Sequence, residues 1–305
     1  MREKALAWFK SVEEKSKNIS FPGLDGIPLY DVAVFFIRGL MKGALTTRAS
    51  AVAFSFYLAI FPAIIFVFTL IPYIPIDNFQ ENLIALLQDL MPTNAYATFQ
   101  EILEDIITKP RGGLLSVGFV LALLFSTNGF SSLIDAFNAT YHDIETRTWF
   151  AQRAISFALV IIIFLLSFSA VILITFGQQL LELMLTKELL HDSFSRIIFW
   201  AGKWVVVIAL LLFAYSSLFY LGPVRKKGWR FISAGSTLAT TISILISVGF
   251  SYYINNFGNY NSLYGSIGTV LVILMWLYLN SVALLIGFEL NASIRNARTG
   301  NQTSV

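Results

Sequence analysis

Three ionisable side chains lie at the ends of long apolar segments, where a charge needs a partner or a function. Arg48 precedes the first apolar segment, Asp135 ends the second, and Glu289 ends the sixth. An ionisable group at the centre of a membrane helix costs ~2.5–3.5 kcal/mol on insertion scales. If these segment ends lie on one side of a membrane, the three side chains could meet there.

Glu289 is the most informative of the three. On the expected boundaries it lies in the last turn of its helix, where the helix dipole favours a cation over a carboxylate. Arg48 is the natural partner to relieve this. The alternative is that Glu289 reaches the membrane interface alone, and the sequence leaves both interpretations open.

Polar residues around Asp135 follow a helical spacing. Asn128, Ser131, Asp135 and Asn138 are three or four residues apart, so they share one helix face. At membrane depth such a stripe either lines a watered cavity or joins helices by hydrogen bonds. The candidate substrate-binding, gating or structural network therefore comprises Arg48, Asn128, Ser131, Asp135, Asn138 and Glu289.

An uncharged stretch rich in Asn, Gly and Tyr joins the fifth and sixth apolar segments. Glycine permits irregular backbone, and amide side chains can bond backbone or ligand groups. The stretch is a candidate outer gate or a tight, self-bonded turn; its candidate residues are Asn259, Tyr260, Asn261, Tyr264 and Gly265.

Pro62 lies inside the first apolar segment. A proline within a helix removes one hydrogen bond and bends the axis, and in membrane helices the freed carbonyl is tolerated where other groups satisfy it. Pro62 is therefore a candidate hinge, or a fixed kink.

Catalytic chemistry has little support in the sequence. There is no cysteine, and the two histidines, His142 and His191, are expected on opposite sides of the membrane. Metal-assisted phosphodiester hydrolysis needs clustered ligands, and no phosphate-binding loop of the GxxxxGK[ST] type occurs. We expect no catalytic residue, no metal site, no cofactor and no nucleic-acid partner, and hence no enzyme.

The elements that must position these residues are membrane helices. The 305 residues are 56% hydrophobic and 13% charged, whereas a soluble domain carries about 25% charged residues. A spanning helix needs ~20 apolar residues, which predicts an all-α, polytopic bundle of six transmembrane helices. The expected spans are Ser50–Tyr73, Gly113–Ile134, Ala154–Leu181, Ile197–Leu221, Phe231–Ile254 and Gly268–Phe288.

The distribution of basic residues predicts the orientation. Most of the 21 Lys and Arg residues lie before the first span, in alternate loops and after the last span, and such residues stay in the cytoplasm. Both termini are therefore expected inside. Residues 1–49 are expected to form cytoplasmic or interfacial amphipathic helices, 50–296 the membrane domain with an outer helical hairpin at 77–109, and 297–305 a cytoplasmic tail.

The N-terminal helices have an apolar face flanked by basic residues. Leu29, Val32, Phe36 and Leu40 line one such face, with Arg38 beside it. Helices of this kind lie in the interface and attract anionic headgroups, or they pack beneath the bundle. Membrane lipids are thus the expected partners, and a homo-oligomer or an envelope partner remains open.

Three stretches of the chain resemble the YihY/BrkB family of bacterial inner-membrane proteins. They are Ala49–Phe66, Arg111–Phe150 and Phe257–Arg295, and the likeness extends over roughly residues 30–296. The resemblance implies a multi-pass protein of the bacterial inner membrane; members carry labels as different as ribonuclease BN, virulence factor and transporter. The matching motif residues are Phe61, Pro62, Asn128, Asn259, Tyr260, Tyr264, Gly265, Glu289 and Asn291.

Two classes of function follow from the sequence. The first is transport or export of a lipid-like or amphiphilic substrate, since buried charges are few and basic helices suit anionic headgroups. The second is a membrane scaffold or envelope-maintenance factor that transports nothing. Ribonuclease activity is not expected.

Overall fold

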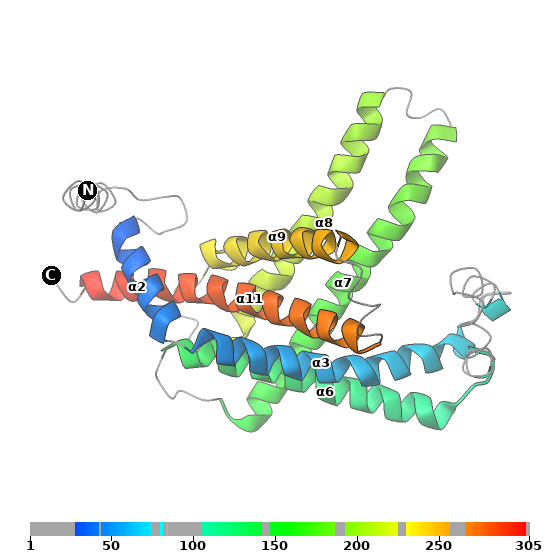
Figure 1. Ribbon diagram of the computed structural model, residues 1–305, viewed down its shortest axis with the longest axis horizontal. Helices are drawn as coiled ribbons and strands as arrows, with labels where there is room; N and C mark the ends of the chain where they lie inside the picture. Colours follow the sequence, from blue (N-terminus) through cyan, green and yellow to red (C-terminus); the bar gives the residue numbers. More distant parts are fainter. Residues whose placement is uncertain are drawn as a thin grey trace. The chain divides into compact units, whose positions relative to one another are not determined.

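The computed structural model describes residues 28–42, 44–74, 80–81, 84, 105, 107–141, 147–186, 193–224, 230–256 and 266–302. Its regular elements in these ranges are all helical (Figure 1). In chain order they are α2 (Leu29–Lys42), α3 (Leu45–Leu70), η1 (Ile71–Tyr73), α6 (Gly112–Asn138), η2 (Ala139–Tyr141), α7 (Trp149–Thr186), α8 (Ser193–Leu221), α9 (Ala234–Asn256) and α11 (Ser266–Gln302).

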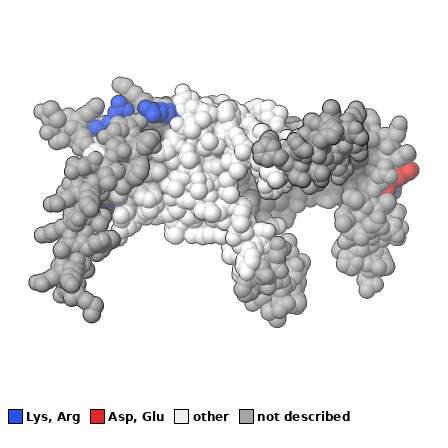
Figure 2. Space-filling view, turned by 90° about the horizontal axis from the view of Figure 1, so that it is seen from above, with Lys and Arg blue, Asp and Glu red and all other residues white. Residues whose placement is uncertain are grey.

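Six of the described helices are long and apolar enough to cross a membrane. The predicted all-α, polytopic architecture is therefore confirmed. The predicted outer hairpin at 77–109 lies mostly outside the described residues, as does the chain before residue 28. On the face shown in Figure 2, the described surface is mostly white, with charged side chains confined to small patches.

The last helix continues well beyond the predicted span. α11 runs to Gln302, so Glu289 lies within the helix and not in its last turn. The dipole argument that singled out Glu289 is therefore wrong, although the residue itself is buried. The helix also continues through most of the stretch predicted as a tail, and Ala297 is buried in a cluster with Val32 of α2.

The chain divides into two compact units. Unit 2 comprises Phe54–Gly129, and unit 1 comprises the remainder, so α3 and α6 each contribute to both. In unit 2, glycines allow α6 to approach α3 closely. A Cβ on Gly129 would lie 2.9 Å from the Phe56 ring, and one on Gly118 would lie 3.3 Å from the backbone of Phe66.

Unit 1 contains α2, α7, α8, α9 and α11. In Figure 1, α7 and α8 run next to one another and cross the direction of α9 and α11 steeply. The backbones of α9 and α11 approach each other closely. A Cβ on Gly287 would lie 2.5 Å from the carbonyl oxygen of Gly235, and one on Gly235 would collide with the carbonyl oxygen of Gly287. Small residues of this kind let membrane helices pack backbone to backbone.

An aromatic cluster joins three helices of unit 1. Phe137 of α6 stacks on Phe288 of α11 with ring centroids 4.2 Å apart, and Phe219 of α8 meets both rings edge-on. All three side chains are fully buried. Phe137 directly follows Ala136, and Phe288 directly precedes Glu289. The aromatic cluster therefore helps to position the polar groups of Ala136 and Glu289 that are described next.

Candidate functional site

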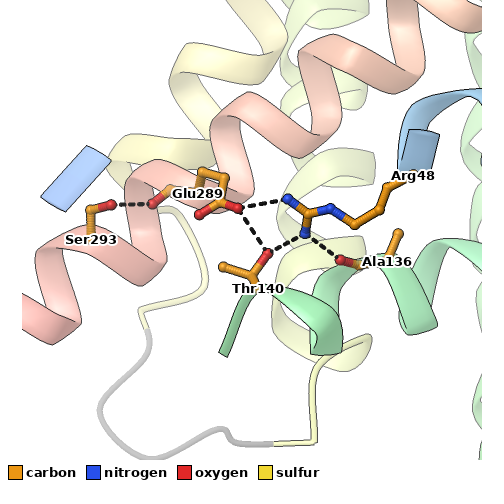
Figure 3. Close-up of polar contacts among 5 residues, drawn as sticks. All are labelled: Arg48, Ala136, Thr140, Glu289 and Ser293. Atoms are coloured by element: carbon orange, nitrogen blue, oxygen red, sulfur yellow. Dashed lines mark hydrogen bonds and ion pairs between the residues drawn. The ribbon is translucent and has the colours of Figure 1, made fainter. Parts of the chain in front are cut away.

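Glu289 is the only buried carboxylate among the residues whose side chains the structure describes, with 3% of its surface exposed. It follows Phe288 of the aromatic cluster on α11. Its main-chain carbonyl accepts a hydrogen bond from the Ser293 hydroxyl at 2.7 Å. The side chain points toward the start of α3 and the end of α6 (Figure 3).

Arg48, in the first turn of α3, is the partner of Glu289. Its Nη2 donates to Glu289 Oε1 at 2.8 Å. Its Nη1 donates to the carbonyl oxygen of Ala136 at 2.9 Å and to the Thr140 hydroxyl at 2.7 Å, and Thr140 in turn donates to Glu289 Oε1 at 3.2 Å (Figure 3). The predicted pair is thus present, and one guanidinium joins α3, α6, η2 and α11.

Gly39 of α2 closes the other side of the carboxylate. A Cβ at this position would lie 2.8 Å from Glu289 Oε2. The glycine therefore lets α2 pass directly over the ion pair. α2 is held there by Val32, which packs with Ile294 and Ala297 of α11.

The pair is enclosed but not fully satisfied. The side chains of Arg48 and Glu289 are 11% and 4% exposed. Arg48 Nε is buried and has no hydrogen-bond partner among the described residues. Removing one member of a buried ion pair leaves an uncompensated charge, at a cost of about 3–5 kcal/mol. The intact pair can therefore hold these helices together, and separation of the two charges would release them.

Asp135 does not lie with this pair. It is exposed on α6, and Gln152 of α7 donates from Nε2 to Asp135 Oδ1 at 2.7 Å and to the Ser131 hydroxyl at 2.8 Å. Two residues of the predicted polar stripe therefore join α6 to α7.

Asn138 joins α6 to the end of α8. Its Oδ1 accepts a hydrogen bond from the main-chain N–H of Val224 at 3.1 Å. Arg147 holds the same segment, donating to the carbonyl oxygens of Gly222 and Pro223 at 2.6 Å each. Burial lowers the pKa of the Arg147 guanidinium from its ordinary value, while the carbonyls at this helix end favour the cation.

Asn291, one of the motif residues, satisfies the start of α9. Its Oδ1 accepts from the main-chain N–H of Gly235 at 2.8 Å, and its Nδ2 donates to the Ser233 hydroxyl at 2.8 Å. The first N–H groups of a helix have no partner within it. Asn291 therefore fixes the register of α9 on α11 where Gly235 and Gly287 touch.

The remaining predicted residues belong to unit 2 or lie outside the described residues. Asn128 is exposed on the part of α6 that belongs to unit 2. Pro62 is buried in α3, which continues through it as a helix, and its role as a hinge stays a prediction. The candidate gate residues Asn259, Tyr260, Asn261, Tyr264 and Gly265 lie outside the described residues, as do His142 and His191.

Four residues of the site were missed in the sequence: Gly39, Thr140, Arg147 and Gln152. Gln152 had a detectable signal, because a polar side chain near the start of an apolar helix needs a partner at membrane depth. Arg147 was counted only as a loop cation. Gly39 and Thr140 gave no sequence signal, since their roles depend on which helix crosses Glu289.

The fold and this polar network define a polytopic helical membrane protein. The chain belongs to the family described as virulence factor BrkB, whose model matches residues 36–304. It is 30% identical over 253 residues to a protein of Bacillus subtilis named as ribonuclease-like, YfkH, covering 83% of this chain and 90% of that protein.

Two further relatives carry names that state no activity. The UPF0761 membrane protein IL2447 of Idiomarina loihiensis is 25% identical over 72% of this chain and 74% of its own length. The UPF0761 membrane protein Smlt0865 of Stenotrophomonas maltophilia is 22% identical over 94% of this chain and 63% of its own length. No solved structure matches the chain.

Proposed function

We propose that this chain transports or exports a lipid-like or amphiphilic substrate across the bacterial inner membrane, with both termini in the cytoplasm. The supporting observation is the buried pair of Arg48 and Glu289, which connects α2, α3, η2 and α11 at one end of unit 1. In this proposal the pair is a latch that holds this end of the bundle closed.

The latch argument rests on the energetics of buried charge. A well-packed apolar replacement is often as stable as a buried ion pair, so stability alone is a weak reason to have one here. Such a pair is most useful when its partners must separate and find water or another counter-ion. A phosphate headgroup could accept from Arg48, whose Nε has no partner among the described residues.

The structure of α2 supports contact with lipid. Val32 faces α11, whereas Ile37 and Met41 are 56% and 82% exposed, and Arg38 is exposed between them. An apolar face beside a cation suits the boundary between acyl chains and anionic headgroups. The sequence left two interpretations of α2, packing beneath the bundle or lying in the membrane interface. In this proposal α2 does both, because one face packs on α11 and the other suits the interface.

The alternative function, a membrane scaffold, has its own support. Ser131, Asp135 and Asn138 are hydrogen-bonded to α7 and to the segment after α8. These bonds favour the interpretation of the polar stripe as a connection between helices. The ribonuclease-like name belongs to the Bacillus relative. Metal-assisted hydrolysis needs clustered ligands, and among the described residues of this chain no three His, Asp or Glu side chains lie close enough together to hold a metal ion.

Reconstitution into vesicles tests the proposal. Purified protein is incorporated into liposomes that contain a fluorescent phospholipid, and exchange between leaflets is followed by chemical quenching of the outer leaflet. The wild type should exchange lipid faster than protein-free vesicles, and Glu289→Gln should change that rate several-fold because the latch loses its charge.

Asp135→Asn is the matched control, since it neutralises a carboxylate that is exposed and keeps an acceptor for Gln152. It should leave the exchange rate near that of the wild type. Exchange no faster than in protein-free vesicles, with correctly folded protein, would contradict transport of phospholipid and favour the scaffold.

A further inference from the structure

Another cation lies inside a membrane span, far from the ion pair. Lys203 falls within the apolar stretch Phe199–Leu221 of α8. Lys203 and Phe219 of the aromatic cluster are ~24 Å apart along the helix, because each residue advances 1.5 Å. Lys203 therefore belongs to the opposite end of the unit 1 bundle from Glu289.

Gly177 of α7 provides the space in which Lys203 lies. A Cβ on Gly177 would be 2.9 Å from Lys203 Cδ, and Gly177 is buried. The aliphatic stem of the lysine thus lies across α7 at the one position where no side chain blocks it. A long basic side chain that buries its stem while its ammonium reaches the interface follows the usual behaviour of lysine near membrane boundaries.

One tryptophan contacts the ammonium, and a second tryptophan contacts the first. Lys203 Nζ lies 5.7 Å from the centre of the Trp204 ring, within the range of a cation–π interaction. Trp200 meets Trp204 edge-on with ring centroids 6.2 Å apart. The two rings are 59% and 40% exposed, and an indole N–H is a hydrogen-bond donor only.

The ion pairs of the described side chains do not include Lys203. An ammonium on one exposed indole ring, with a second indole next to it, is complementary to an anionic, oxygen-rich group at a membrane boundary. A phosphodiester bears such oxygens at this depth in every phospholipid.

We propose that Lys203, Trp200 and Trp204 bind the phosphodiester headgroup of an anionic membrane phospholipid, with Gly177 positioning the lysine. The ammonium pairs with the phosphate, and the exposed indoles contact the glycerol and upper acyl region. The site does not depend on transport, because it lies on the surface of the α7–α8 hairpin and away from the Arg48–Glu289 pair.

Native mass spectrometry of the delipidated full chain, titrated with phosphatidylglycerol, tests this site. Lys203→Met should weaken the tightest binding by about five-fold, the effect of one cation near an anionic surface. Lys203→Arg should stay within about two-fold of the wild type, because it retains the charge. Binding of phosphatidylcholine should change much less in all variants.

Substitutions at two glycines of the same hairpin distinguish an effect on the position of Lys203 from an effect on folding. Gly177→Ala should displace the lysine and weaken binding by at least about two-fold, whereas Gly202→Ala, where a Cβ meets nothing within 4 Å, should not. Thermal unfolding of each variant establishes that it is folded. Unchanged binding in Lys203→Met would overturn the proposal, and displacement of the lipid by millimolar inorganic phosphate would overturn the assignment to a lipid.

Discussion

α7 and α9 belong to the same unit but are packed in opposite ways. The most apolar stretch of α7 has a mean hydropathy of 3.1, and 6% of that stretch is buried inside the protein. The corresponding stretch of α9 has a mean hydropathy of 1.4, and 28% of it is buried. α9 packs through Gly235, Ala239 and Ser243, and the Tyr215 hydroxyl of α8 donates to the Ser243 hydroxyl at 2.9 Å.

This contrast shows what drives helix packing in the chain. Lipid tails are as apolar as leucine, so hydrophobicity gives a membrane helix little reason to be buried within protein. Close backbone approach and hydrogen bonds between helices do favour burial of a membrane helix within the protein. The most hydrophobic helix is therefore the one that faces outward, which is the reverse of a soluble core.

Among the changes that test this contrast, the largest effect is expected from a methyl group placed in the α9–α11 contact. Gly235→Ala would drive its Cβ into the carbonyl oxygen of Gly287 and the side chain of Asn291, which should destabilise the protein by about 3 kcal/mol or more. The measurement is thermal unfolding in detergent.

Gly249→Ala on the same helix is the control, because nothing lies within 4 Å of its Cβ. It should be neutral or stabilising by up to about 1 kcal/mol. Equal losses in the two variants would mean that α9 does not pack on α11 through Gly235.

A smaller effect is expected where α2 crosses the ion pair. Gly39→Ala places a Cβ against Glu289 Oε2, and Arg48 limits how far the carboxylate can move, so a loss of about 1–3 kcal/mol is expected. In a Glu289→Ala background the same substitution should cost much less, because its obstacle is gone. Purely additive losses would contradict the contact between Gly39 and Glu289.

The exposed face of α7 should tolerate change. Phe164 and Phe168 are 63% and 54% exposed and stack on each other. Phe164→Leu should alter the free energy of unfolding by less than about 0.5 kcal/mol. A clearly larger loss would show that this face is covered by protein, and analytical ultracentrifugation would then reveal whether a second copy covers it.

The smallest effect concerns Asp105, whose side chain is 30% exposed, against 4% for Glu289. Its hydrogen bond to Lys109, with a further contribution from Arg111, holds the pKa of the Asp105 carboxyl below its usual value of 3.8. A lowered pKa stabilises the folded state at pH values above the unfolded pKa, and this contribution is lost as pH falls through the folded value.

Asp105→Asn should therefore lower Tm slightly at pH 7, and the difference should vanish as the pH falls through the lowered folded pKa, because the wild-type carboxyl is then protonated too. Added salt should reduce the difference at pH 7, because exposed pairs are screened. A large difference at neutral pH that persists in salt would mean that Asp105 is enclosed as Glu289 is.

Much of the fold could be predicted from the sequence because the membrane imposes simple constraints. Span lengths follow from bilayer thickness, and the requirement that a charge at membrane depth has a partner pointed to Arg48 and Glu289. The helix end at Gln302 could not be predicted in this way. Hydropathy falls after Phe288, but Ile294 and Ala297 continue the helix by packing on α2.

The details of the site depended on tertiary geometry. Nothing local marks Gly39 or Thr140, because each matters only when α2 and η2 meet Glu289. The three-or-four spacing predicted one polar face for Asn128, Ser131, Asp135 and Asn138. The partners of the last three, Gln152 and the Val224 N–H, come from other elements. Spacing identifies a polar face, and packing determines what that face contacts.

A double-mutant cycle on Arg48 and Glu289 tests most directly whether the two charges act as one buried unit. The free energies of unfolding are compared for the wild type, Arg48→Met, Glu289→Met and the double variant. Each single variant should lose about 3–5 kcal/mol, and the double variant should lose far less than the sum, because neither charge is left alone. Losses that simply add would contradict the latch.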